Sequence, residues 1–182
     1  MKATGIVRRI DDLGRVVVPK EIRRTLRIRE GDPLEIFTDR EGEIILKKYS
    51  PIGELGTFAQ QYADSLAQTT GYVVCVTDRD TVIACAGNGK KEYLGRHISR
   101  ELEELIQGRQ SLQAVSGDRS FVPVSSEPIE GILSETIAPV ISEGDAIGSV
   151  ILLGREGKNK MGETEQKLAA VAEAFLGRQM EQ

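Results

Sequence analysis

The sequence of 182 residues predicts two domains: a small, mostly β N-terminal domain that dimerises by exchanging strands, and an α+β C-terminal domain whose antiparallel sheet is flanked by helices. Three observations predict this fold class. Pro51 and Gly53 separate a strand-like run from a helical run, the residues before them form two strand pairs around one short helix, and the residues after them alternate helices with hairpins. We therefore expect domains at 1–50 and 55–182, joined by a linker at 51–54.

The N-terminal segment is expected to need a second copy of itself. Its elements follow in the order strand, strand, helix, strand, strand, at 4–10, 15–18, 20–28, 34–38 and 43–48, with turn residues between the strands of each pair. A domain of this size buries too little surface to be stable without staples or oligomerisation. No disulfide or metal cluster is evident in the segment, so strand exchange between two chains is the expected solution.

The C-terminal segment shows alternating helix and strand patterns. Apolar residues recur at helical spacing from Leu55 to Leu66, and Gly71 ends this helix. A second helix begins with Ser99 as its cap and ends at Gly108. The remaining expected elements are hairpins at 72–77 with 81–86 and 136–141 with 146–153, a last helix at 162–180, and a loop at 108–131 containing a possible edge strand at 121–124.

Charge is distributed unevenly along the chain. The net charge is −4, but residues 1–29 contain nine basic and three acidic residues, an excess of six positive charges. The remainder of the chain is acidic, so the excess is confined to the N-terminal segment. A local basic excess of this kind indicates a nucleic-acid partner in a chain whose total charge argues against one.

Composition excludes several other classes. The sequence has no apolar run of the ~18 residues that a membrane span requires, and no apolar stretch near its start that would indicate a signal peptide. Two cysteines fit a reducing compartment and do not form a disulfide framework. We therefore expect a cytoplasmic protein without a membrane partner.

The segment TGIVRRIDDLGRVVVPKEIRRTLRIREGDPLEI, within 4–49, resembles the AbrB-type swapped-hairpin DNA-binding domain. The resemblance implies a double-psi-like interleaved barrel with short helices, formed by two chains and bound to double-stranded DNA. It also implies that Arg8, Arg15, Arg23 and Arg24 contact DNA. Arg9 matches a further basic position of the family and is a secondary candidate for the same contact. The expected function is transcription regulation, as activator and repressor, by a protein associated with the nucleoid.

The later segment, with its hairpin IAPVISEGDAIGSVILLG, resembles a GAF sensor domain. This resemblance implies a module that senses a small molecule or a partner. No ligand-specific motif is present, so the ligand is unidentified and no known cofactor is expected. The glycine-rich loop at 87–91 lacks the complete spacing of a phosphate-binding loop and is interpreted as a turn that borders a ligand site.

The helices at 54–69 and 162–180 each carry an apolar stripe. The stripes can cover the sheet, form a helix bundle between two GAF-like domains, or do both. If the C-terminal domains pair differently from the N-terminal ones, the assembly is a homotetramer with two DNA-binding dimers.

Other reactive residues support alternative functions less well. Cys75 and Cys85 lie on neighbouring expected strands, where apolar packing is favoured over thiol chemistry. His97 has no recognisable nucleophile beside it, and the N-terminal acidic residues lack metal-ligand spacing, so neither a catalytic nor a metal site is expected. An antitoxin that binds a protein partner, a GAF-type redox enzyme and a cyclic-nucleotide module remain as alternatives.

Overall fold

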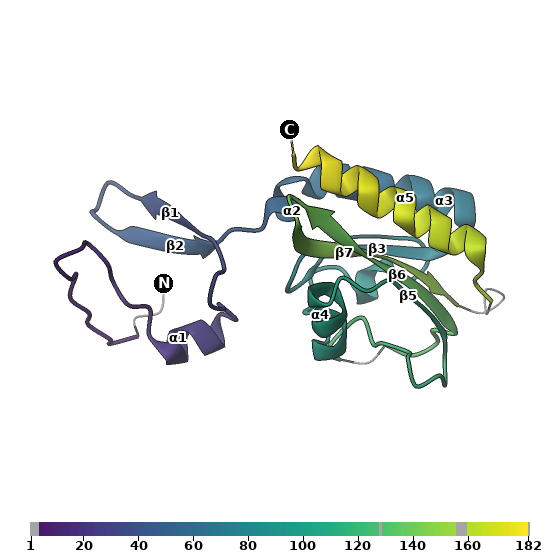
Figure 1. Cartoon of the computed structure of the whole chain (residues 1–182), viewed down its shortest axis with the longest axis horizontal. Coiled ribbons are helices and arrows are strands. Elements are labelled where there is room, and N and C mark those ends of the chain that lie inside the picture. The colour runs from purple at the N-terminus through teal and green to yellow at the C-terminus, as the bar shows by residue number, and fades with distance from the viewer. Residues whose placement is uncertain (1–3, 128, 156–159, 182) are drawn as a thin grey trace. The chain divides into compact units, whose positions relative to one another are not determined.

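The computed structural model describes residues 4–127, 129–155 and 160–181, and divides the chain into two compact units, Met1–Tyr49 and Ser50–Gln182 (Figure 1). Residues 51–54, expected to be a linker, instead form a short helix, α2 (Pro51–Glu54), which Ser50 caps by accepting a hydrogen bond from the Gly53 backbone N–H. Ile52 on this helix is fully buried in the core of the second unit.

The first unit contains a helix, α1 (Lys20–Thr25), and a hairpin of strands β1 (Leu34–Thr38) and β2 (Ile44–Lys48). The expected hairpin is confirmed, with Ile36 opposite Leu46 in an antiparallel ladder. Its turn is closed by Asp39, whose carboxylate accepts the backbone N–H groups of two following residues. The hairpin therefore combines strand pairing with a turn built from side-chain hydrogen bonds.

Two N-terminal predictions differ from the structure of the single chain. Residues 4–10 and 15–18 are not strands, because a strand needs a neighbour for its backbone hydrogen bonds, and among described residues 4–49 the sheet consists of β1 and β2. The helix expected at 20–28 ends at Thr25, because Arg27 adopts a left-handed backbone conformation with φ of 53°. Pro19 is the N-cap of this helix, immediately before its first turn.

The second unit is built on a five-stranded antiparallel sheet with strand order β4-β3-β7-β6-β5. Its two hairpins occur where the sequence predicts them, and β7 joins them by pairing with both β3 and β6. The strands are β3 (Val73–Thr77), β4 (Val82–Ala86), β5 (Leu112–Val115), β6 (Ser134–Ser142) and β7 (Asp145–Gly154).

Helices cover both faces of this sheet (Figure 1). Helices α3 (Gly56–Thr70) and α5 (Glu163–Gln179) pack on one face, and α4 (Arg100–Gln107) packs on the other. The predicted end of α3 and the predicted start of α4 are both confirmed. Gly71 ends α3 in a left-handed conformation, and the Ser99 hydroxyl caps α4 by accepting the Leu102 N–H.

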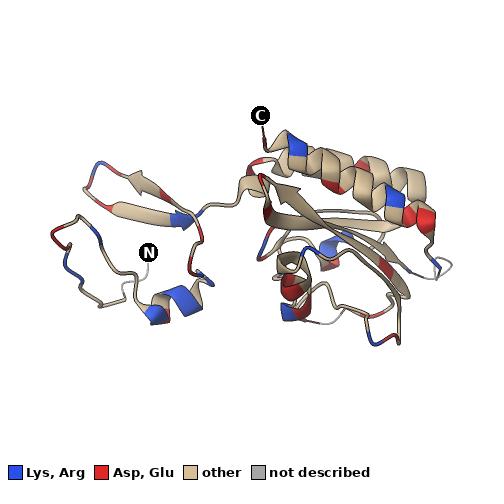
Figure 2. Cartoon of the chain, in the orientation of Figure 1, with Lys and Arg blue, Asp and Glu red and all other residues tan. Residues whose placement is uncertain are grey.

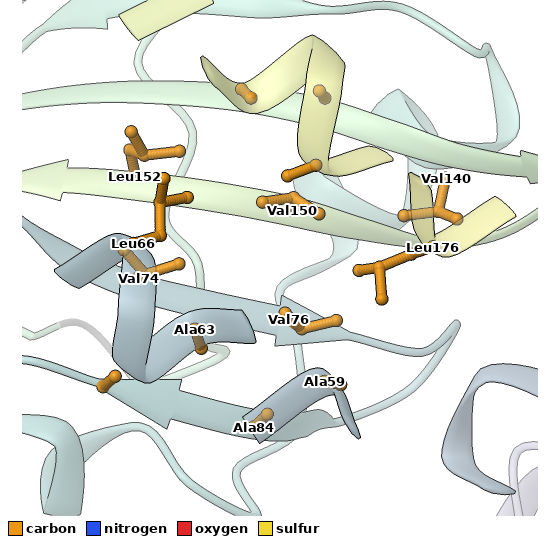
Figure 3. Packing of buried hydrophobic residues seen from close by; sticks show 14 of the residues in the cluster. Ala59, Ala63, Leu66, Val74, Val76, Ala84, Val140, Val150, Leu152 and Leu176 are labelled. Carbon is orange, nitrogen blue, oxygen red and sulfur yellow. The ribbon is translucent and has the colours of Figure 1, made fainter. Parts of the chain in front are cut away.

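Alternation along the strands produces two apolar cores. Figure 3 shows the first core, in which Ala63 and Leu66 of α3 and Leu176 of α5 pack against the valines of β3, β6 and β7. Small residues on α3 allow the helix to approach the sheet closely. The second core lies under α4, where Leu102 and Ile106 cover the opposite face.

The edge strand differs from the prediction. Residues 121–124 are not a strand, and the edge of the sheet beside β6 is β5, which lies within the segment expected to be loop. Segment 121–124 instead passes over the α4 face of the sheet, where the Val122 N–H donates to the side chain of Glu135 rather than to a strand. Pro123 has no N–H to contribute to a ladder.

A glycine on α5 tests how closely this helix approaches the sheet. A Cβ atom on Gly177 would collide with the backbone carbonyl oxygen of Ile141, whereas a Cβ on Gly56 of α3 would meet no atom within 4 Å. Gly177→Ala should therefore lower the free energy of unfolding by about 1–3 kcal/mol. Gly56→Ala should leave it unchanged or raise it slightly. Chemical denaturation of both variants checks this, and equal stabilities would refute the close approach.

Candidate nucleic-acid interface

Three of the predicted DNA-binding residues lie at an ordered turn at 11–15: Arg8 and Arg9 precede it in sequence and Arg15 belongs to it. One Asp11 carboxylate oxygen accepts the backbone N–H groups of Leu13 and Arg15, at 3.1 and 2.8 Å. The other carboxylate oxygen accepts the Nε–H of Arg15 at 2.8 Å. Gly14 occupies the left-handed region that the turn requires, with φ of 76°. The turn therefore holds the guanidinium of Arg15 in one orientation.

Asp11 is ionised across the neutral pH range. The Arg15 backbone N–H and then the Arg15 side chain hold the pKa of its carboxyl below the ordinary value. Because the carboxylate stays charged, it keeps its hydrogen bonds to the turn at neutral pH. The Asp11 carboxylate therefore closes the turn and orients the Arg15 side chain.

Two of the other predicted arginines lie on α1 and two lie in the segment before the turn (Figure 2). Arg8, Arg9 and Arg24 are exposed, and Arg23 is half-buried. In the described part of the chain, none of these four guanidinium groups forms a salt bridge with a carboxylate. Their charges therefore remain available to an anionic partner.

The same unit exposes an unusual number of apolar side chains. Among described residues 4–49 only Pro19 is buried. Val7 is 85% exposed and Val17 is 71% exposed, although both belong to the segments predicted to be strands. Ile36 and Ile44 on the hairpin are about equally exposed, at 66% and 67%. A soluble domain does not leave this much apolar surface in contact with water, so these side chains indicate a missing partner surface.

The cysteines of the second unit are packed as the apolar interpretation predicts. Cys75 and Cys85 lie directly opposite each other on β3 and β4, and both are buried. Their sulfur atoms are 3.2 Å apart. Burial, and then the hydrogen bond with Cys85, raise the pKa of the Cys75 thiol well above its ordinary value. A redox enzyme needs an accessible thiolate, which this environment disfavours.

His97 and the loop at 87–91 have structural contacts. The His97 ring is exposed, and its Nδ1 lies 3.4 Å from the Asp80 carbonyl oxygen. The loop turns sharply at Gly89, and the Arg155 guanidinium packs against it while binding the Glu92 carboxylate at 2.9 Å. The turn that sequence reasoning expected is present, and its place beside a ligand stays a prediction.

Sequence reasoning missed Glu135, a fully buried carboxyl on β6. Burial raises its pKa to about 7, although the hydrogen bond from the Val122 N–H opposes the shift. Its inward-facing position could have been found, because it stands two residues before Ile137 in a strand that alternates between two apolar cores.

The packing of the cysteines predicts slow thiol modification. Iodoacetamide at pH 8 should alkylate Cys75 and Cys85 at least about a hundredfold more slowly in the folded protein than in urea, because reaction requires local opening. Mass spectrometry of the alkylated chain measures both rates. Modification of either thiol in the native state at the unfolded rate would contradict the structure and restore the redox interpretation.

No described helix combines the length and apolar character required to cross a membrane.

Models of known protein families match both units. The model for the C-terminal domain of stage V sporulation protein T, described as a transcription factor, matches residues 54–181. The model for MazE, a bacterial antitoxin of the antidote–toxin recognition type, matches residues 7–54.

Relatives match the whole chain and its first unit. Stage V sporulation protein T of Bacillus subtilis is 54% identical over all 182 residues and is covered over its full length. The transition state regulatory protein AbrB of the same organism is 67% identical over 51 residues, which are 28% of this chain and 52% of AbrB.

A solved structure matches the second unit in fold. The GAF domain of an Acinetobacter phosphoenolpyruvate-protein phosphotransferase has a TM-score of 0.53 at 14% identity, covering 71% of this chain and 88% of that one. The second unit therefore has the predicted GAF-like fold, with its five-stranded sheet and flanking helices. Identity over the full length and the match to residues 54–181 show that the chain belongs to the stage V sporulation protein T family of transcription factors.

Proposed function

We propose that the chain is a DNA-binding transcription regulator of sporulation genes, acting as activator and repressor from a homodimer formed by residues 1–50. The observation that carries the proposal is made on the first unit: Arg8, Arg9, Arg23 and Arg24 form no salt bridge in the described part of the chain, and only Pro19 is buried among residues 4–49. The similarity to stage V sporulation protein T over the full length, at 54% identity, and the AbrB-like first unit support the proposal.

Dimerisation would complete the first unit. Segments 4–10 and 15–18 each carry apolar side chains that no part of the same unit covers. Pairing these segments with those of a second chain would satisfy their backbone groups and bury the exposed valines. The dimer would also place two copies of each arginine on one rigid surface.

DNA binding would then depend on Arg8, Arg9, Arg15, Arg23 and Arg24. A planar guanidinium binds phosphate oxygens in pairs and can also bind the edge of guanine. Helix α1 has only six residues, so it is short for a recognition helix. We expect modest reading of bases and a strong contribution from the shape and deformability of the duplex.

The second unit would oligomerise through the outer surface of α3 and α5. Phe175 of α5 stacks against Phe58 and Tyr62 of α3, with ring centroids 5.4 and 5.3 Å apart. Phe175 is 36% exposed and Val171 is 62% exposed, although α5 already covers the sheet with its other side. A helix bundle between two second units would bury this aromatic surface and produce a homotetramer.

The GAF-like unit would also bias DNA binding in response to a small molecule, in a cytoplasmic, nucleoid-associated protein. Such coupling requires a ligand with different affinities for two states of the assembly. The antitoxin alternative draws on the match of residues 7–54 to MazE. A folded second unit from a transcription-factor family makes regulation the better supported function.

Removing one arginine tests the DNA interface. If eight phosphates are neutralised by the dimer, the logarithm of the binding constant should fall against log salt with a slope of about −7. Arg15→Ala should make the slope shallower by about two, since a dimer loses two guanidinium groups, and should weaken binding about tenfold or more.

Arg100→Ala is the matched control, because Arg100 is an exposed arginine of the second unit. Fluorescence anisotropy with duplex DNA, measured across salt concentrations, provides both quantities. The proposed interface is excluded if Arg15→Ala and Arg100→Ala bind DNA with the wild-type affinity and slope.

A charge on α5 tests the tetramer. Val171→Glu should reduce the mass in solution from about four chains of 19.9 kDa to two, because the carboxylate would be buried between helices. Ala170→Glu adds the same charge to the same helix about 100° around its axis, away from Phe175, and should leave the mass unchanged. Sedimentation equilibrium distinguishes these outcomes, and a tetrameric Val171→Glu variant would remove α5 from the interface.

A further inference from the structure

Residues 121–126 form a strap that crosses the α4 face of the second unit's sheet. At one end the strap is bound to the segment that starts α4: the Ser99 N–H donates to the Val124 carbonyl oxygen and the Ser126 N–H donates to the His97 carbonyl oxygen, both at 3.1 Å. At the other end the Val122 N–H donates to a Glu135 carboxyl oxygen at 2.7 Å. The strap therefore joins the segment that starts α4 to the beginning of β6.

The carboxyl that receives the strap is enclosed by apolar groups. Glu135 is fully buried, and on the sheet it lies between Ala114 of β5 and Leu153 of β7. Its second oxygen has no hydrogen-bond partner among the described residues. A carboxylate in such a place lacks the hydration that stabilises its charge, so the neutral carboxyl is favoured while the strap is closed.

Among the residues that the structure describes, no basic side chain forms a salt bridge or hydrogen bond with Glu135. Strand β5 has no ionisable residue, and β6 has none besides Glu135. Arg155, beyond the end of β7, binds Glu92, and α4 turns Leu102 and Ile106 toward the sheet. Helix α5 packs on the opposite face. Described charged residues near the strap in sequence are Asp118, which accepts the Val115 N–H, Arg119, Glu127, which binds Arg96, and Glu130. Helix α4 adds Arg100, Glu101, Glu103 and Glu104, of which Arg100 binds Glu104.

We propose that Glu135 is a proton-dependent latch: its neutral carboxyl holds the strap against the sheet, and loss of the proton favours release of the strap. Release exposes Val122 and Val124, together with part of the apolar face that they cover. The latch thus controls access to the α4 face of the sheet in the second unit. It does not require the first unit to bind DNA.

The direction in which strap opening changes with pH follows from the protonation of Glu135 in the closed and open states. In the closed state burial raises the pKa of Glu135 from 4.5 to about 7, whereas in the open state water restores the ordinary value. Between these values the open state is ionised and the closed state is protonated. The opening equilibrium constant should therefore rise about tenfold per pH unit as pH increases and level off above the upper value.

Hydrogen–deuterium exchange of the full-length protein tests the latch. Protection of the backbone N–H groups in the strap, corrected for the intrinsic exchange rate, should fall about tenfold per unit between pH 5.5 and 7. In Glu135→Gln, which keeps the acceptor oxygen and removes the titration, protection should be independent of pH. His97→Asn, which removes the chain's only histidine beside the strap, should behave as wild type.

Two results would overturn the proposal. The first is that hydrogen-exchange protection of the strap in the wild type does not change with pH. The second is that this protection falls with pH as steeply in Glu135→Gln as in the wild type. If Glu135→Gln does not fold, the wild type still decides the matter. ¹³C NMR of its glutamate side chains should show one carboxyl titrating near pH 7 together with loss of strap protection, while β6 and β7 remain protected. If the carboxyl titrates at one pH and strap protection is lost at another, the latch is excluded.

Discussion

The structure depends on a constraint that the first unit cannot satisfy alone: apolar side chains have to leave water, and this unit has almost no interior. The second unit buries its aliphatic residues on both faces of one sheet. In the first unit, Val7 and Val17 remain mostly exposed and their segments have no strand to pair with. Burial of this surface between two chains would explain why about fifty residues suffice for a stable domain.

The same constraint connects the fold to the chemistry of DNA binding. A guanidinium group contributes most to binding when its position is set before the DNA arrives. Asp11 sets the position of Arg15 through the turn, and pairing of the flanking segments would fix that turn on the dimer surface. Assembly of the core and presentation of the positive charges would thus be one event.

The sequence predicted the hairpins and helix ends of the second unit well, and it predicted the edge strand β5 and the segments 4–10 and 15–18 poorly. Alternation and turn residues placed β6 and β7, and the caps Gly71 and Ser99 marked helix ends correctly. Segment 121–124 was misassigned because its partner is the side chain of Glu135, and no local pattern reports a contact between distant segments. Of the proposed DNA-binding residues, only Arg15 had a local signal for its orientation, the aspartate four residues earlier.

Isotope-filtered NMR of full-length protein, mixed from labelled and unlabelled chains, tests strand exchange most directly. It detects only contacts between different chains. We predict contacts from the methyl groups of Val7, Val16 and Val17 of one chain to residues 1–50 of another. If these valines contact residues of their own chain alone, the first unit is a self-contained monomer, and the proposed assembly is wrong.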